Sequence, residues 1–166
     1  VGAGFEEGRV YLPQLLMSAE SAKAAAGLIK EKLSESGEAK EKGEKVIIAT
    51  VRGDIHDIGK NIVKILLENY GFDVIDLGKD VPEEIILETA EKENVRLIAL
   101  SALMTTTVPA MKRCVELVHE KLKSTRVMVG GAVLSQEYAD MIGADYYAKD
   151  AMQGVRFAEE FFKDKG

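Results

Sequence analysis

Five short runs of apolar, often β-branched residues alternate with amphipathic helical stretches along most of this 166-residue chain. The runs that predict strands cover residues 46–51, 72–77, 97–100, 126–129 and 145–148. The helices predicted after them cover 58–70, a stretch opened by Pro82, a stretch from Met111 to Leu122, residues 135–142, and a last stretch from Val155 to Phe162. Five strand–helix units in series predict an α/β protein with a doubly wound parallel sheet, its helices on both faces. Right-handed crossovers favour the strand order 2-1-3-4-5.

The first 45 residues follow a different pattern. Pro13 suits the first turn of a helix, and residues 14–33 place apolar side chains at near-helical spacing. Residues 34–45 hold two glycines and almost no apolar side chains, which is typical of a solvated linker. We therefore predict a helical segment over 1–33, a linker over 34–45, and a flavodoxin-like (Rossmann-like) domain over 46–166. A lone amphipathic helix cannot bury its own stripe, so 1–33 must pack on the domain, on further helices or on a ligand.

Composition excludes several classes of function. A net charge of −6 argues against a nucleic-acid partner, which needs a basic surface. No uncharged apolar run approaches the ~20 residues of a membrane span, so we expect a cytoplasmic protein without membrane contact. The single cysteine, Cys114, excludes an internal disulfide and is expected to be a buried thiol, while His119 is expected at the surface. The chain begins at Val1 rather than methionine, which suggests a piece of a longer protein.

The loop Gly53–Asn61 follows the first predicted strand and leads into a helix, which places it at the edge of the sheet where ligands bind. A neutral imidazole such as that of His56 is a good metal ligand through one nitrogen. A carboxylate two residues earlier, Asp54, could hold the proton on the other nitrogen. Gly59 would let a bulky group approach the backbone. The alternative is an aspartate that caps the helix and a histidine that only occupies a loop.

Two further strand ends carry small or polar residues at the same predicted edge. Residues 101–107 (SALMTTT) bring four hydroxyls, and Gly130-Gly131-Ala132 follows the fourth strand. Taken singly, the first could serve helix capping and the second a tight turn. Together with Asp54 and His56 they favour a deep ligand slot. The chain holds no phosphate-loop or dinucleotide-binding motif.

These residues resemble a known signature. Asp54-x-His56-x-x-Gly59, Ser101-x-Leu103 and Gly130-Gly131 are similar to the D-x-H-x-x-G…S-x-L…G-G pattern of cobalamin (vitamin B12)-binding domains. The continuation through GDIHDIGKNIV resembles the methyltransferase branch. The stretch from Phe5 to Leu15 resembles the end of the helical cap that precedes this domain in methionine synthase and in corrinoid proteins.

The resemblance implies a cofactor and a site. Cobalamin would bind with its lower base detached and inserted in the slot, and His56 would take the base's place as axial ligand of cobalt. Asp54 would hydrogen-bond the imidazole and Thr107 would complete a relay. The residues expected to contact the cofactor are Phe5, Leu12, Asp54, Ile55, His56, Asp57, Ile58, Gly59, Ser101, Leu103, Met104, Thr105, Gly130, Gly131, Ala132, Asp150 and Ala151.

The implied function is methyl transfer by a module that is incomplete alone. Cob(I)alamin would take a methyl group from a donor such as methyltetrahydrofolate, and methylcobalamin would pass it to an acceptor such as homocysteine. The expected partners are donor and acceptor domains or subunits, and a reductive-activation domain is a further candidate. A homodimer could form through the cap remnant. Alternatives are a corrinoid protein of a methylamine or methanol system and a non-catalytic cobalamin sensor. A signalling receiver on the same sheet is a further alternative, but it would need an aspartate where Ser101 lies.

Overall fold

The computed structural model describes residues 43–163 and, before them, only residues 4, 8–11, 13–14, 17–18 and 21. Phe5, Leu12, most of the predicted helix over 14–33 and the linker up to residue 42 lie outside the described residues. The predicted cap segment, the linker and the homodimer therefore stay predictions. Among the described residues, no helix combines the length and the apolar character needed to cross a bilayer.

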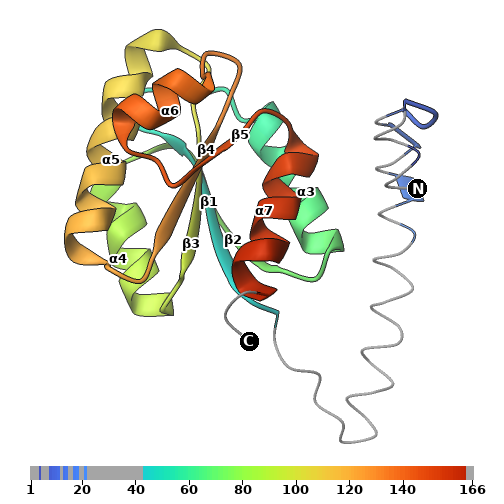
Figure 1. Cartoon of the computed structure of the whole chain (residues 1–166), viewed down its shortest axis with the longest axis horizontal. Coiled ribbons are helices and arrows are strands. Elements are labelled where there is room, and N and C mark those ends of the chain that lie inside the picture. The colour runs from blue at the N-terminus through green and yellow to red at the C-terminus, as the bar shows by residue number, and fades with distance from the viewer. Residues whose placement is uncertain are drawn as a thin grey trace, which may run out of the picture.

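The described domain is built on a parallel five-stranded sheet (Figure 1). Its strands are β1 (Lys45–Val51), β2 (Asp73–Val81), β3 (Leu97–Ser101), β4 (Arg126–Gly130) and β5 (Tyr146–Ala148). The order is β2-β1-β3-β4-β5 and every neighbouring pair is parallel, which confirms the predicted topology. The carboxyl ends of all strands therefore meet at one edge.

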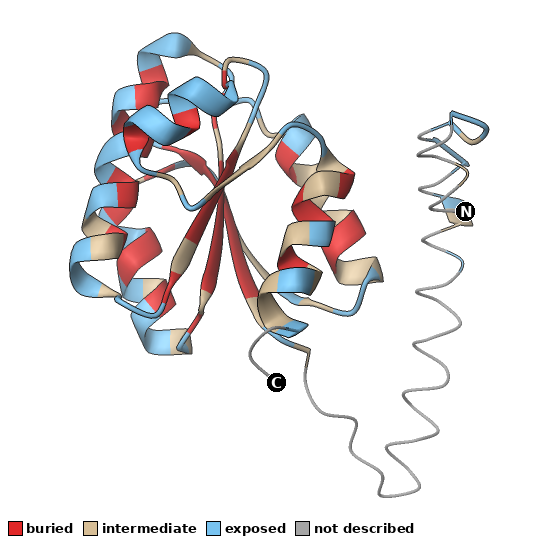
Figure 2. Ribbon diagram, viewed as in Figure 1, coloured by how far each residue is buried: buried red, intermediate tan, exposed pale blue. Residues whose placement is uncertain are grey.

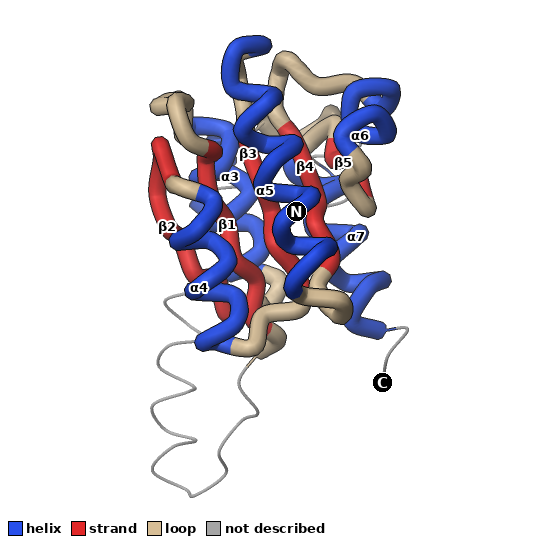
Figure 3. The backbone as a smooth tube through the Cα atoms, turned by 90° about the vertical axis from the view of Figure 1, so that its left-hand side faces the viewer, coloured by secondary structure: helices blue, strands red, loops and turns tan. Residues whose placement is uncertain are grey.

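Helices cover both faces of the sheet. They are α3 (Ile58–Asn69), α4 (Glu83–Glu93), α5 (Val108–Lys121), α6 (Gln136–Ile142) and α7 (Ala151–Lys163), with a short 3₁₀ turn, η1, over Thr105–Thr107. Figure 1 shows α3 and α7 on one face and α4, α5 and α6 on the other. The tube view of Figure 3 shows α4 and α5 in front of the strands.

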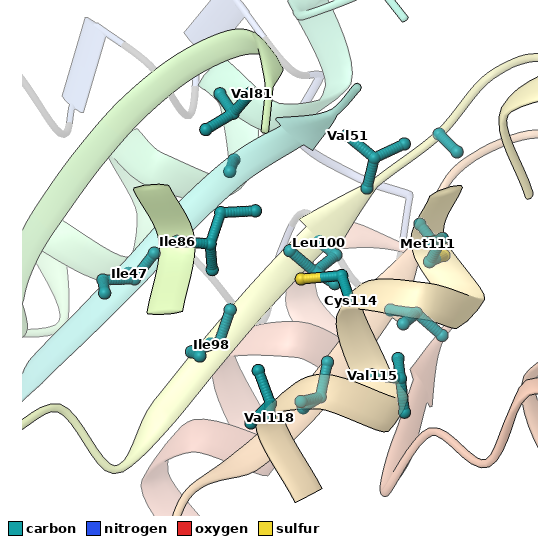
Figure 4. Close-up of a cluster of buried hydrophobic side chains, with 14 of the residues drawn as sticks. Ile47, Val51, Val81, Ile86, Ile98, Leu100, Met111, Cys114, Val115 and Val118 are labelled. Carbon is teal, nitrogen blue, oxygen red and sulfur yellow. The ribbon is translucent and has the colours of Figure 1, made fainter. Parts of the chain in front are cut away.

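Side chains alternate along the strands between two apolar cores, and the strands themselves are the most buried part of the ribbon (Figure 2). In β1, Ile47 packs toward the α4–α5 side and Ile48 toward the α3–α7 side. Figure 4 shows the first core, where Ile98 and Leu100 of β3 meet Cys114 of α5. Cys114 is buried as predicted, and burial raises the pKa of its thiol to about 12, so it stays protonated.

Two sequence expectations need correction. β2 was expected to end at residue 77, but it continues to Val81, because its carboxyl end is bulged and still pairs with β1. The spacing of apolar residues in the stretch 58–70 would put Ile58 on the apolar face of that helix, but Ile58 is 78% exposed, since the first turn of α3 lies beyond the sheet edge. His119 is a boundary residue as expected, with Nε2 2.6 Å from Asp145 Oδ2.

Candidate functional site

The loop between β1 and α3 carries a fully buried carboxylate, Asp54. Its Oδ1 accepts hydrogen bonds from the backbone N–H of His56 (3.0 Å) and lies 2.8 Å from His56 Nδ1. Its Oδ2 accepts from the backbone N–H groups of Leu103 (2.7 Å) and Met104 (3.3 Å), in the loop after β3. Asp54 therefore joins the ends of two adjacent strands, β1 and β3, which the sequence predicted to lie at the same edge of the sheet.

These donors determine the charge of Asp54. Burial alone would raise the pKa of its carboxyl group. The backbone hydrogen bonds from His56 and Leu103, with those from the side chains of His56 and Thr107, outweigh burial and hold the pKa well below its usual range. The group is thus a permanent acceptor at neutral pH.

A permanent acceptor at Nδ1 fixes the tautomer of His56. With its hydrogen on Nδ1, the neutral ring carries a lone pair on Nε2, and that nitrogen has no hydrogen-bond partner among the described residues. The His56 side chain is 45% exposed, so Nε2 can be reached from outside. The backbone carbonyl of His56 accepts a weak bond from buried Thr50 at 3.4 Å, which ties the loop to β1.

Thr107 lies behind Asp54 and is buried. Its hydroxyl is 3.0 Å from Asp54 Oδ2 and 2.8 Å from the carbonyl oxygen of Met104. A hydroxyl has one hydrogen, so Thr107 can donate to only one of these acceptors at a time. The predicted relay is thus present as a chain of contacts from Thr107 through Asp54 to His56. At its outer end, the Thr107 hydroxyl can donate either to Asp54 or to Met104.

A cavity of about 460 Å³ opens beside this loop, between the α3–α7 face and the ends of β1, β3, β4 and β5. This volume lies within the ~300–1,000 Å³ of ordinary small-molecule sites. Its lining includes the predicted residues Gly59, Ser101, Gly130, Gly131 and Ala132 from the three strand ends, and Asp150 and Ala151 after β5. The other described residues predicted to contact the cofactor do not line it: Asp54, Ile55, His56, Asp57, Ile58, Leu103, Met104 and Thr105. Leu103 and Met104 bind Asp54 through their backbone, and Thr105 is an exposed residue at the start of η1.

Two glycines shape this cavity differently. A Cβ on Gly131 would collide with the backbone carbonyl of Ala102, and φ at Gly131 is +134°, so the local backbone requires glycine at this position, which also lines the cavity. At Gly59 a Cβ would meet no atom within 4 Å. Gly59 therefore leaves open space where α3 borders the cavity.

Exposed apolar side chains lie on the loops around His56. Ile55 is 62% exposed and Leu103 is 43% exposed, and Ile58 is the most exposed of the three. Single exposed apolar residues need no explanation, but three on the two loops joined by Asp54 form an apolar surface around a free imidazole nitrogen. This surface suits a flat, largely apolar ligand. Asp57, between Ile55 and Ile58, is half-buried, and no side-chain hydrogen bond caps α3.

Sequence reasoning missed two charged residues of the cavity wall, Lys60 and Lys149, of which Lys60 is the buried one. Its side chain is 1% exposed, and its Nζ lies 2.7 Å from Asp76 Oδ1 on β2. Burial would raise the pKa of Asp76, but the hydrogen bonds from Lys60, Gly78 and Lys64 outweigh it and lower that pKa. The available signal was spacing, because Lys60 lies two helical turns before buried Leu67 on the same face of α3.

The lowered carboxyl pKa values predict how stability depends on pH. Asp54, Asp76 and Glu83 all have pKa values below those of the unfolded chain, so the stability that they add is complete above about pH 5 and is lost as the pH falls further. We expect the urea midpoint to fall between about pH 5 and pH 3, and to fall less in Asp54→Asn. Equal losses in the two proteins would show that Asp54 contributes nothing to this dependence.

Within the described residues no group of three or more His, Cys, Asp or Glu side chains could hold a metal ion. A metal bound through His56 would have to bring its other ligands with it. A macrocycle that surrounds its metal would meet this requirement, and the exposed apolar residues and the cavity would offer contacts for the ring and for an appended group. The described residues fit a corrinoid.

Comparison with known proteins agrees with this chemistry. The profile of a family described as the B12 binding domain matches residues 44–156. This chain belongs to that family. Its cofactor is cobalamin, as the sequence predicted. The chain is 43% identical over 162 residues to dimethylamine corrinoid protein 3 of Methanosarcina mazei, with 96% of each chain covered.

Solved structures of two kinds resemble the domain. The methanol:cobalamin methyltransferase complex MtaBC of Methanosarcina barkeri matches with a TM-score of 0.86 at 32% identity, covering 97% of this chain and 61% of that chain. A receiver domain of a Francisella response regulator matches with a TM-score of 0.58 at 17% identity, covering 75% of this chain and all of the other. The second likeness shows the fold alone. What the two proteins share is the doubly wound sheet.

Proposed function

We propose that His56 Nε2 is the axial ligand beneath cobalt and that the cofactor's own base enters the cavity lined by Ser101, Gly130 and Ala151. The single observation that carries the proposal is the Asp54–His56 pair, which leaves one imidazole nitrogen free on the loop that leads to Gly59, and Gly59 lines a cavity of suitable size. When bound, the corrinoid supplies a metal centre that accepts and gives up a methyl group.

In this proposal the chain holds one ring hydrogen and could take up a second. Asp54 Oδ1 would keep the first hydrogen on Nδ1 while Nε2 holds the metal. If Nε2 were released from the metal, it would be free to accept a proton, and the Asp54 carboxylate would stabilise the imidazolium. Thr107 can then turn its hydroxyl toward Asp54 Oδ2 and donate a hydrogen bond to the carboxylate.

The methyltransferase system is inferred from the relatives. The sequence favoured methionine synthase, with a methylamine or methanol corrinoid protein as the alternative. The relatives support the alternative, since several are named dimethylamine corrinoid proteins and one structural neighbour is a methanol methyltransferase complex. We propose that the chain carries methyl groups from a methylamine methyltransferase subunit to an acceptor methyltransferase. Its cytoplasmic location stays a prediction.

The test compares different methyltransferases as methyl donors to the cobalamin-loaded chain. The chain is loaded with cobalamin, reduced, and mixed with the methyltransferases for dimethylamine, monomethylamine or methanol, or with the methyltetrahydrofolate domain of methionine synthase. Methylation of the loaded chain by one of the first three, followed spectrally, is the expected result. Methylation only by the folate domain would restore the methionine synthase assignment. A chain that binds cobalamin but is methylated by none would favour the sensor alternative.

His56→Gly tests the ligand role alone. We expect this variant to keep bound cobalamin through the cavity contacts while the visible spectrum changes to that of a corrinoid without a lower nitrogen ligand. The measurement is absorption after gel filtration, with His119→Gln as the matched control that changes the other histidine. An unchanged spectrum in His56→Gly would refute the assignment.

A further inference from the structure

The end of β2 that faces the Asp54 loop is irregular. The register with β1 runs from Ile48 opposite Asp76 to Val51 opposite Val81, so β2 holds two more residues than β1 over this stretch. Extra residues of this kind bend a strand and re-aim its groups, and they are frequent beside functional sites. Here the extra length carries β2 to the loop that holds His56.

Asp80 lies in this bulged end with φ of +53°. Only one other described non-glycine residue has positive φ, Asn94, and it has the ordinary position for that conformation at the end of α4. Asp80 terminates no helix. A left-handed residue at such a place is strained, and strain of this kind persists where surrounding contacts require it.

The contacts of Asp80 give the reason. Its backbone N–H donates to the carbonyl oxygen of Asp54 at 2.9 Å, and its Oδ1 accepts from the backbone N–H of Gly53 at 2.7 Å. The two bonds hold the chain before and after the Cα of Asp54. In its left-handed conformation, Asp80 presents both its amide and its carboxylate to the same loop.

We infer that Asp80 is a positioning residue for the cobalt ligand. It holds the backbone of Asp54, Asp54 holds the imidazole of His56, and the imidazole is thereby aimed at the metal. This inference rests on the proposed axial role of His56. A purely local role in closing the β2 end would leave the Asp54 carboxylate and its other partners undisturbed.

Two substitutions separate the contributions of Asp80. Asp80→Gly keeps the backbone bond and relieves the strain but removes the acceptor for Gly53. Asp80→Asn keeps an oxygen acceptor and tolerates the left-handed conformation. Asn94→Gly makes the matched backbone change at the other left-handed residue, away from the site.

The first readout is electron paramagnetic resonance of bound cob(II)alamin, in which an axial nitrogen splits the cobalt lines. We expect Asp80→Gly to lower the ratio of histidine-coordinated to uncoordinated cofactor by about fivefold, the effect of losing one ordinary hydrogen bond. Asp80→Asn and Asn94→Gly should match the unsubstituted chain. A full nitrogen signal in Asp80→Gly, or equal losses in Asp80→Gly and Asp80→Asn, would overturn the inference.

The second readout uses the chain without cofactor. Amide hydrogen exchange should quicken by about fivefold in Asp80→Gly at His56 and Leu103, whose amides donate to the Asp54 carboxylate, as well as at Gly53. Faster exchange at Gly53 alone would show that Asp80 does not position Asp54. This arm decides the inference even if the unsubstituted chain binds cobalamin without coordination by His56, in which case the proposed function fails separately.

Discussion

Replacing Asp54 with alanine should destabilise the domain by about 3 kcal/mol and abolish coordination by His56 in the cobalamin-loaded chain. The alanine leaves the amides of His56 and Leu103 without their acceptor, and each buried donor left unsatisfied costs ~1–3 kcal/mol. It also frees the imidazole to rotate and to change tautomer. Urea unfolding measures the first effect, and the cob(II)alamin resonance spectrum measures the second.

Asp57→Ala is the matched control for this result. Asp57 is the same residue type in the same loop, but its side chain makes no capping hydrogen bond to α3. We expect its loss to change stability by no more than ~0.5 kcal/mol and to leave the spectrum unchanged. Similar losses of stability in the two variants would contradict the role assigned to the Asp54 carboxylate.

Gly59→Leu should weaken cobalamin binding by roughly 100-fold or more without destabilising the fold. Gly59 borders the cavity, and a side chain there has free space in the empty site but would occupy the volume that the cofactor's base must enter. Leucine is also a better helix residue than glycine by up to ~1 kcal/mol, so the stability of the first turn of α3 should be kept or raised. Binding is measured by spectral titration and stability by urea unfolding.

A graded series makes this prediction specific. Gly59→Ala should weaken binding less than Gly59→Leu, because it adds one methyl group. Glu88→Leu, which adds the same side chain on an exposed position of α4 across the sheet, should bind cobalamin normally. Tight binding by Gly59→Leu would mean that the cofactor's base does not use this cavity.

The fold was predictable because its signals are local and repeated. A β-branched run at 46–51 and an apolar run at 97–100 marked buried strands, and crossover chirality then left few strand orders. The error at β2 has a physical cause. Residues 78–81 carry a glycine and charged side chains that look like a loop, and only pairing with the end of β1 makes them a strand.

The site was predictable only as far as its motif residues. Asp54, His56 and Thr107 are in contact as predicted, although they are up to 53 positions apart, because parallel strand ends share one edge. The contacts that hold them are not encoded in local patterns. Leu103 binds Asp54 with its backbone amide, a group that every residue except proline has. Lys60 is buried because it pairs with Asp76 on another strand. Asp80 reaches the Asp54 loop because the end of β2 is bulged.

The most direct test of the account is the resonance spectrum of cob(II)alamin bound to a chain whose histidines carry nitrogen-15. The chain has two histidines, and His119 is held by Asp145 beside the start of β4, at the opposite edge of the sheet. If His56 is the axial ligand, each cobalt line must change from the three-fold splitting of nitrogen-14 to the two-fold splitting of nitrogen-15. A three-fold splitting that survives the labelling would show that the cofactor's own base stays on the metal, and the central claim would be wrong.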